Sequence, residues 1–172
     1  ALHDSMTGLA NRWMLGEQMD ALLRVVQPGG QQFALLHIGV DRLDSFSVSE
    51  RHVVLREVAS RLQRALRHSD LLARVGKGTF AVILRGVHRQ TDVRQVADKL
   101  LGAVSGVCFT GISNRRITCS LGCARYPTDG VESHLLSRHA DLALQAAAQE
   151  GGGCCHFHER ATGLTKPFSL GL

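Results

Sequence analysis

The sequence predicts an α/β (α+β) fold in which helices flank a central, mostly antiparallel sheet. Three observations support this fold class. Segments with helical periodicity alternate with short apolar runs of strand length along the whole chain. Two of those runs, residues 71–75 and 80–84, are separated only by a short glycine-containing turn, which is typical of a hairpin. The hydrophobic fraction of 44% is ordinary for a globular protein and argues against a disordered chain.

The first half of the chain is predicted to contain two helices with a strand between them. Apolar residues recur at helical spacing over residues 11–26, and the sequence Pro28-Gly29-Gly30 is expected to end this helix. Residues 33–40 are almost continuously apolar, which predicts a central strand covered on both faces. A second helix is expected over residues 49–67, because its apolar residues again share one side.

The predicted hairpin comes next, and its turn contains Gly76 and Gly78. We expect these glycines to adopt positive φ, which glycine accepts because it has no Cβ atom. The alternation of helix and strand then continues to the end of the domain. The remaining elements are predicted as a helix over residues 91–104, strands over 107–110 and 116–125, a helix over 132–149 closed by three glycines, and a final strand over 154–158.

The length of 172 residues suits a single domain. We assign residues 1–158 to this domain and interpret residues 159–172, which contain two glycines and a proline, as a linker. Because the motifs described below begin within a few residues of Ala1, we expect the chain to be a piece of a longer protein. No run approaches the about 18 apolar residues of a membrane helix, so we expect no direct membrane insertion.

Lys and Arg outnumber Asp and Glu by 20 to 15, which gives a formal net charge of +5. The positive residues are spread along the chain and aromatic residues make up only 5% of it, so we expect no nucleic-acid binding. The five cysteines lack the pair spacing of metal sites, which predicts free thiols in a reducing cytoplasm. The run Cys-Cys-His-Phe-His at residues 154–158 resembles a metal-binding sequence, but a strand with alternating faces is the preferred interpretation.

Four stretches of the chain carry motifs. They read Asp-Ser-Met-Thr-Gly-Leu-Ala-Asn-Arg at 4–12, Arg-His-Ser-Asp at 67–70 with Ala-Arg-Val-Gly at 73–76, Ser-Leu-Gly at 120–122 with Tyr-Pro-Thr-Asp-Gly at 126–130, and Ala-Asp-Leu-Ala-Leu at 140–144. In this order they resemble the GGDEF domain family, the bacterial diguanylate cyclases that make cyclic di-GMP from two GTP. The resemblance implies a nucleotide-cyclase-like, ferredoxin-type sandwich.

In active members of that family, carboxylates on the central strand and on the signature hairpin hold divalent cations, which activate the attacking 3′-hydroxyl and stabilise the α-phosphate. The first of these carboxylates falls on Gly39, so that only Asp41 remains of an Asp-x-Asp pair. The signature contains neither of its acids and reads Gly76-Lys77-Gly78-Thr79-Phe80. We therefore expect no catalytic residues, no bound metal, no cofactor and no diguanylate cyclase activity.

The positions that contact the nucleotide in that family also differ. The residues that read guanine fall on Ser47 and His52, and the phosphate-binding Lys and Arg of the last helix fall on Ala148 and Gly152. Because such contributions act cooperatively, we expect no single neighbour to replace them. Two alternatives stay open, namely a working cyclase and a domain that binds GTP without turnover.

One ligand site of the family is retained in form. Arg67 and Asp70 match its Arg-x-x-Asp inhibitory site for cyclic di-GMP, in which Arg contacts phosphate or guanine and Asp accepts guanine N–H groups. The same two residues also suit a structural role, in which Asp70 caps backbone amides and pairs with Arg67. A full site needs a second arginine, for which Arg94 is the nearest candidate in the sequence.

These residues and the resemblance together indicate a catalytically inactive GGDEF-type domain with a regulatory or interaction role in bacterial cyclic di-GMP signalling. The resemblance implies neighbouring domains of the same protein as partners, with a sensor upstream and an EAL phosphodiesterase domain downstream. Pairing with a second copy of the chain is a further arrangement that the resemblance allows. A cyclic di-GMP sensor is the main alternative function.

Overall fold

The computed structural model describes residues 2–25 and 32–159. In this part of the chain the helices are α1 (Arg12–Val25), α2 (Val48–Ala65), α3 (Gln90–Val104) and α4 (Ser133–Gln149), with a short 3-10 helix at Leu43–Ser45. The strands are β1 (Ala10–Asn11), β2 (Phe33–Val40), β3 (Leu71–Arg74), β4 (Thr79–Arg85), β5 (Gly106–Phe109), β6 (Asn114–Ile117), β7 (Cys119–Tyr126) and β8 (Cys155–Phe157).

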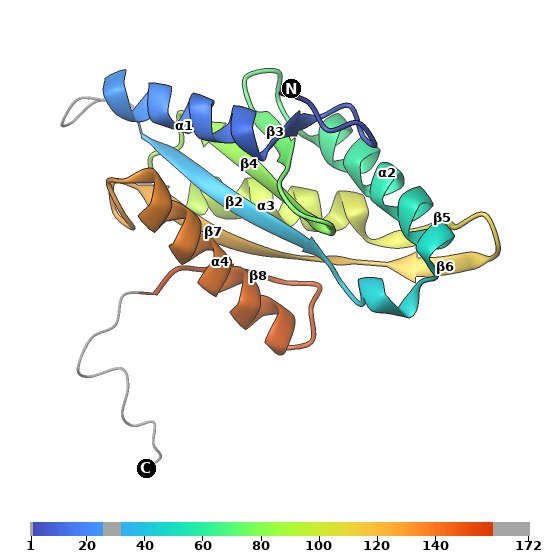
Figure 1. Cartoon of the computed structure of the whole chain (residues 1–172). Coiled ribbons are helices and arrows are strands. Elements are labelled where there is room, and N and C mark those ends of the chain that lie inside the picture. Colours follow the sequence, from blue (N-terminus) through green and yellow to red (C-terminus); the bar gives the residue numbers. More distant parts are fainter. Residues whose placement is uncertain (1, 26–31, 160–172) are drawn as a thin grey trace, which may run out of the picture.

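Six of these strands form one sheet in the order β1-β3-β4-β2-β7-β8, while β5 and β6 form a separate two-stranded sheet (Figure 1). Among the described strand pairs only β1–β3 and β7–β8 are parallel, so the predicted mostly antiparallel sheet is confirmed. β2 lies between β4 and β7, and its residues 33–38 are buried. This burial accounts for the almost continuous apolar sequence of β2.

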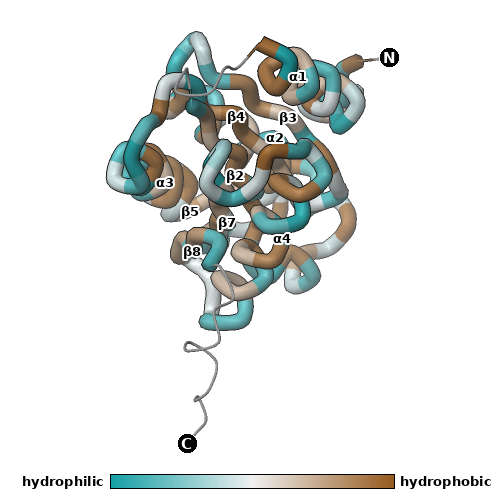
Figure 2. The backbone as a smooth tube through the Cα atoms, turned by 90° about the vertical axis from the view of Figure 1, so that its left-hand side faces the viewer, coloured by the Kyte–Doolittle hydropathy of each residue, from teal (hydrophilic) through white to brown (hydrophobic). Residues whose placement is uncertain are grey.

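The helices cover both faces of the sheet and create two hydrophobic cores. Residues of α2 and α3 pack on one face with Leu36 and Ile38 of β2. Residues of α1 and α4 pack on the other face with Phe33 and Leu35 of β2. Figure 2 shows α3 on one side of the strands and α1 and α4 on the other, with hydrophobic residues along the strands between them. Successive residues of β2 therefore point into different cores, as the geometry of a strand requires.

Helix α4 approaches β7 closely because Gly122 has no side chain. A Cβ atom at this position would lie 2.2 Å from the carbonyl oxygen of Ala140 and from the amide nitrogen of Leu144. Both of these neighbours are backbone atoms of α4 and cannot turn aside. Gly122 thus allows the close approach of α4 to the sheet at Ala140 and Leu144.

The strand predicted over residues 116–125 is in fact two strands, and this prediction was wrong. β6 ends at Ile117, and β7 begins at Cys119. Thr118 between them interacts with Asp41, because its carbonyl accepts the Asp41 amide at 3.0 Å and its hydroxyl donates to the Asp41 carboxylate at 2.6 Å. The chain therefore leaves the β5–β6 pair at Thr118 and continues alongside β2.

The prediction of positive φ at the hairpin turn was also wrong. Gly76 and Gly78 are absent from the positive-φ residues of the described chain, and the turn is closed by the amides of Val75 and Gly76, which both donate to the Thr79 carbonyl. The three glycines after α4 do have positive φ, as do five other glycines of the described residues, which suits the predicted glycine-closed end of this helix. The expected helix stop at Pro28 and the linker beyond Glu159 lie outside the described residues.

All five cysteine side chains are unpaired thiols, which agrees with the prediction from their number and spacing. The described residues also bear on membrane insertion. Within residues 2–25 and 32–159, no helix combines the length and the apolar character that a membrane span requires.

Candidate functional site

The register of the sheet brings together the positions at which the resemblance places metal-binding acids. Gly39 of β2 pairs with Thr79 of β4 on one side and with Ser120 of β7 on the other. The amide of Val40 donates a hydrogen bond of 3.2 Å to the carbonyl of Gly78. The positions of Gly39, Gly78 and Thr79 are therefore adjacent at one end of the sheet, although none of these three residues carries a carboxylate.

Two arginine side chains bind carbonyl groups of the turn between β3 and β4. Arg74 donates from Nη2 to the Lys77 carbonyl at 2.7 Å and from Nε to the Gly76 carbonyl at 3.2 Å. Arg12 donates from Nη2 to the Val75 carbonyl at 2.9 Å. These bonds connect the turn to the first residue of α1 and fix the conformation of its backbone.

Asp4 of the first motif supports the same turn through Arg74. Its carboxylate accepts hydrogen bonds from the amide of Thr7 at 2.9 Å and the hydroxyl of Thr7 at 2.7 Å, and it lies 3.2 Å from Nη1 of Arg74. Burial acts to raise the pKa of Asp4, but the hydrogen bonds from Thr7 and the charge of Arg74 lower that pKa below its ordinary value. Asp4 is therefore an ionised residue that positions Arg74.

A depression of about 420 Å³ lies beside this turn. Its apolar lining consists of Met6, Leu43, Val48 and Leu55, and its polar lining of Asp44, Arg51, His52, Arg74 and Lys77. The volume is within the range of small-molecule sites. Arg74 is already paired with Asp4, so Arg51 and Lys77 against Asp44 leave this depression with a small positive charge, which favours an anionic ligand.

The side chain of Leu43 occupies the space beside Gly78. A Cβ atom at Gly78 would lie 2.5 Å from Cδ2 of Leu43. The acid that the family signature carries at this position would therefore need Leu43 to move. Leu43 packs instead against the core on the α2 and α3 side of the sheet.

The two positions that resemble guanine-reading residues have different environments. His52 lines the depression of about 420 Å³. Ser47 is the N-cap of α2, where its hydroxyl accepts the Glu50 amide at 3.3 Å and its own amide donates to Glu50 Oε1 at 3.0 Å. This reciprocal pair is a capping box, so the hydroxyl of Ser47 has a structural partner.

A second depression, of about 440 Å³, is found at the end of β2. Its lining residues are Gly39, Val40, Asp41, Arg42, Ser120, Leu144, Gln145, Ala148 and Gly151. Ala148 is the position at which the resemblance expects a phosphate-binding lysine. The charged residues of this lining are Asp41 and Arg42, one of each sign, so it has no net cationic character.

Asp41 accepts three hydrogen bonds from within the domain. Its Oδ1 accepts the hydroxyl of Ser120 at 2.6 Å, and its Oδ2 accepts the hydroxyl of Thr118 at 2.6 Å and the amide of Gly153 at 2.8 Å. A Cβ atom at Gly152 would lie 2.6 Å from the Asp41 carboxylate. A larger residue at Gly152 therefore does not fit beside Asp41 with the present backbone.

These observations test whether the residues suit the divalent cation that the resemblance implies. Mg²⁺ prefers several oxygen ligands, usually carboxylates and waters. The carboxylates that line the two depressions are Asp41, which already accepts three hydrogen bonds, and Asp44, which lies in the same lining as Lys77. The linings of these two depressions therefore do not offer the set of free carboxylates that a hard divalent cation prefers.

Arg67 and Asp70 are in contact, at the loop between α2 and β3. Asp70 accepts the Arg67 amide at 2.8 Å and the guanidinium at 3.2 Å from Nε and 2.9 Å from Nη2. The Asp70 side chain is 1% exposed, whereas that of Arg67 is 51% exposed. The hydrogen bond to Asp70 raises the pKa of Arg67. Arg94, the predicted second arginine, instead lies over the ring of Phe157 at 4.8 Å.

A polar pair on the face of β2 that α4 covers was not predicted from the sequence. His37 Nδ1 lies 2.5 Å from Oδ1 of Asp141 on α4, in a depression of about 310 Å³ that Arg12 and Ser137 also line. The His37 side chain is buried, while Asp141 reaches solvent. His37 lies within the apolar sequence of β2, and its partner Asp141 is distant in the sequence. The pair could therefore be found only from the packing of α4 on the sheet.

The sequence of this chain is similar to those of known proteins. A family model described as "Diguanylate cyclase, GGDEF domain" matches residues 1–154. The bifunctional diguanylate cyclase/cyclic di-GMP phosphodiesterase MucR of Pseudomonas aeruginosa is 30% identical over 162 residues, which are 91% of this chain and 24% of MucR. Diguanylate cyclase TpbB of the same species is 30% identical over 158 residues, which are 89% of this chain and 36% of TpbB. The chain thus spans less than half the length of these relatives.

Solved structures have the same fold. The GGDEF domain of TpbB (YfiN) from Pseudomonas aeruginosa matches with a TM-score of 0.85 and 29% identity, over 91% of this chain and 94% of that chain. The GGDEF domain of DgcB from Caulobacter crescentus, in complex with c-di-GMP, matches with a TM-score of 0.81 and 25% identity, over 92% of this chain and 94% of that chain. These matches confirm the predicted fold class.

Proposed function

The chain belongs to the GGDEF domain family, and from this premise we propose that it acts as a regulatory or interaction module in cyclic di-GMP signalling rather than as a diguanylate cyclase. The proposal rests mainly on the residue types at two paired positions at the end of the sheet, Gly39 and Thr79. Gly39 and Thr79 lie opposite one another, as paired metal-binding positions would, but they supply no charged oxygen.

The chemistry of cyclisation explains why this composition matters. Joining two GTP molecules requires attack of a 3′-hydroxyl on an α-phosphate, and the charge that develops there needs cationic stabilisation. In this chain Asp41 is held by Thr118, Ser120 and Gly153, and Leu43 fills the space beside Gly78. These contacts engage the carboxylate that remains and the space beside Gly78 within the domain, which supports a role that does not include turnover.

An exposed apolar surface supports the interaction role. Val107, Phe109 and Ile112 of the β5–β6 hairpin are 57%, 62% and 67% exposed. Apolar side chains grouped on one projecting element are typical of a contact with another protein surface. The partner we propose is a neighbouring domain of the same protein, since the curated relatives MucR and TpbB are several times longer than the matched region.

A cyclic di-GMP sensor is the second candidate function, and the exposed guanidinium of Arg67 favours it. Half of this side chain is accessible to a ligand phosphate. The relative DgcB has been solved in complex with c-di-GMP. Against this role stands Asp70, whose buried carboxylate already accepts three hydrogen bonds from Arg67. Binding through both residues would require this pair to open.

Calorimetry with GTP and with cyclic di-GMP, on the purified chain, separates these functions. The interaction module predicts no heat of binding with either nucleotide. A signal with cyclic di-GMP that disappears in Arg67→Ala supports the sensor, and Arg89→Ala is the matched control because Arg89 also pairs with an aspartate three residues later. A signal with GTP alone supports binding at the cationic depression beside Lys77 without turnover.

A further inference from the structure

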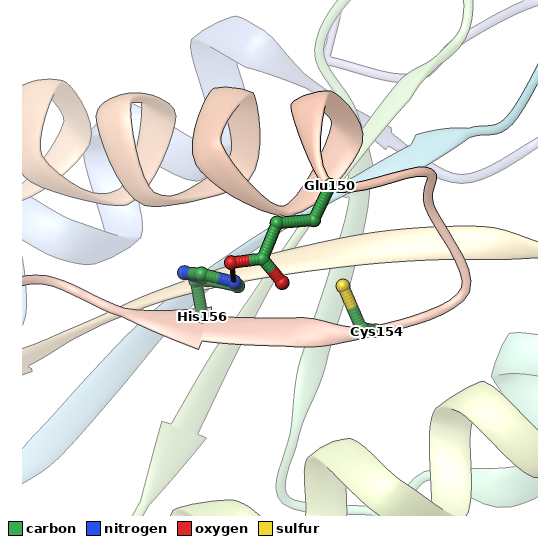
Figure 3. A group of neighbouring side chains, drawn as sticks. All are labelled: Glu150, Cys154 and His156. Atoms are coloured by element: carbon green, nitrogen blue, oxygen red, sulfur yellow. Dashed lines mark ion pairs between the residues drawn. The ribbon is translucent and has the colours of Figure 1, made fainter.

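Three side chains of different chemistry meet where α4 passes into β8. Glu150 is the C-cap of α4, Cys154 precedes β8, and His156 lies within β8 (Figure 3). Nε2 of His156 is 3.0 Å from Oε2 of Glu150. One donor atom from each residue, a carboxylate oxygen, a thiol sulfur and an imidazole nitrogen, lies within 4.8 Å of the other two.

The backbone explains why these residues come together. Gly151, Gly152 and Gly153 have φ of +114°, +80° and +68°, which favours glycine and reverses the chain between α4 and β8. Residues two apart in an extended segment share a face, so Cys154 and His156 point to the same side. The residue between them faces the core, where its sulfur lies 3.4 Å from Sγ of Cys123.

The cluster is open to solvent on one side. The side chain of Glu150 is 62% exposed and that of His156 is 29% exposed, while Cys154 is half-buried. An ion can therefore reach the three donor atoms from solution, and the long Glu150 side chain can move without disturbing the core. The cluster lies on the α4–β8 connection, whereas the positions at which the family resemblance expects metal ligands lie on β2 and the β3–β4 turn.

We propose that Glu150, Cys154 and His156 bind a zinc ion, with a fourth position left for water or a ligand atom. Zinc accepts thiolate, imidazole and carboxylate ligands together, and three protein ligands with one open position is an established arrangement for this ion. Magnesium and calcium are poor candidates because they prefer oxygen ligands alone. Metal–ligand distances of 2.0 to 2.3 Å place tetrahedral donors about 3.5 Å apart. Nε2 of His156 and Oε2 of Glu150 are already 3.0 Å apart, and no pair of donor atoms is more than 4.8 Å apart, so a bound ion requires the side chains around the Cys154 sulfur to move closer by about 1 Å.

The electrostatics of Cys154 make the proposal testable by pH. Burial, together with the negative charges of Glu150 and Asp41, raises the pKa of the Cys154 thiol. Without a cation this thiol is therefore neutral, and its sulfur lies 3.5 Å from the carbonyl of Ala147. A bound zinc ion stabilises the thiolate, so that binding releases a proton and weakens as the pH falls.

The competing explanation is a surface ion pair between His156 and Glu150 with a neutral thiol beside it. Zinc titration of the purified chain, reduced and freed of metal with a chelator, distinguishes the two. We expect one Zn²⁺ to bind per chain, and Co²⁺ used as a probe to show the near-ultraviolet absorption of a cobalt–thiolate bond. Cys154→Ser is expected to abolish that absorption, and both Cys154→Ser and His156→Gln are expected to weaken Zn²⁺ binding by about tenfold or more.

A matched control exists on the same helix. His134 pairs with Glu132 at 3.7 Å on the surface of α4, and no cysteine belongs to the pair. His134→Gln is expected to leave Zn²⁺ binding unchanged. If Cys154→Ser unfolds the domain, Glu150→Gln at the exposed position provides the second test and is expected to weaken binding by about tenfold. The proposal is overturned if the wild-type chain binds no Zn²⁺, or if the Cys154→Ser or Glu150→Gln chain binds it as tightly as wild type.

Discussion

Gly39 and Thr79 are directly opposed across the β2–β4 pair, at the end of the sheet where the β3–β4 turn meets the central strand. These two positions are close enough to form a metal site, because carboxylates placed there would face a shared cation. Their chemistry is not that of a metal site, since one has no side chain and the other has a hydroxyl. The proposed regulatory function follows because the positions of a metal site are present while the acidic side chains are not.

The close packing of α4 on β7 gives the first prediction. Gly122→Ala is expected to lower the free energy of unfolding by about 3 kcal/mol, because the new methyl group meets backbone atoms of α4 rather than flexible side chains. Gly102→Ala on the exposed side of α3 is the control, since a Cβ atom there has open space. That control is expected to raise stability by about 0.5 to 1 kcal/mol through helix propensity. Urea unfolding measures both, and equal stabilities for the two variants would refute the packing argument.

The Arg67–Asp70 contact gives the second prediction. Asp70→Ala is expected to lower the free energy of unfolding by about 1 to 3 kcal/mol, because the buried carboxylate satisfies the Arg67 amide and guanidinium. Arg89→Ala, which removes an exposed ion pair of the same spacing, is expected to change stability by about 0.5 kcal/mol or less. Thermal unfolding compares the two, and an Asp70→Ala chain as stable as wild type would leave no structural role for this residue.

The buried thiol of Cys119 gives a pH-dependent prediction. Burial, with the nearby negative charge of Asp41, raises the pKa of Cys119 from 9.0 to about 12. The folded protein therefore keeps this proton at pH values where the unfolded chain releases it. Below pH 9 this thiol does not make the free energy of unfolding depend on pH. Between pH 9 and pH 12 the free energy of unfolding falls, by at most about 1.4 kcal/mol per pH unit. Cys119→Ala should show a shallower decline in urea unfolding above pH 9, and an unchanged decline would contradict the assignment.

Most helices and strands could be predicted from the sequence, because burial on one or both faces leaves a periodic apolar pattern. The predicted bounds of β2 agree with the structure to the residue. The break at Thr118 could not be predicted in this way, since it depends on a hydrogen bond to Asp41, which is distant in the sequence. The two-residue strand β1 and the 3-10 helix after β2 were missed because such short segments carry no period.

The candidate site could be predicted in part, because motif residues indicate which strand ends lie together. Motif residues indicated which positions should be adjacent, and the strand register brings Gly39, Gly78 and Thr79 together. The cluster of Glu150, Cys154 and His156 was visible only as a Cys-Cys-His-Phe-His run. Its carboxylate was not anticipated, because Glu150 joins the cluster only through the turn made by three glycines with positive φ.

The exposed β5–β6 hairpin gives the fourth prediction. Phe109→Ser is expected to leave the unfolding temperature of the domain unchanged within about 2 °C, because this side chain is 62% exposed and belongs to neither core. In the full-length protein the same change is expected to increase hydrogen exchange of the hairpin, by loosening its contact with a neighbouring domain. Unchanged exchange in the full-length protein would argue against the hairpin as the contact surface.

Product formation from GTP distinguishes a regulatory domain from a working diguanylate cyclase. Purified protein is incubated with GTP and either Mg²⁺ or Mn²⁺, and cyclic di-GMP is quantified by chromatography, with diguanylate cyclase TpbB as the positive control. The absence of metal-binding acids at Gly39, Gly78 and Thr79 predicts no cyclic di-GMP above the level of a sample without protein. Sustained formation of cyclic di-GMP by this chain would show that the domain is a working cyclase and would overturn the proposed regulatory function.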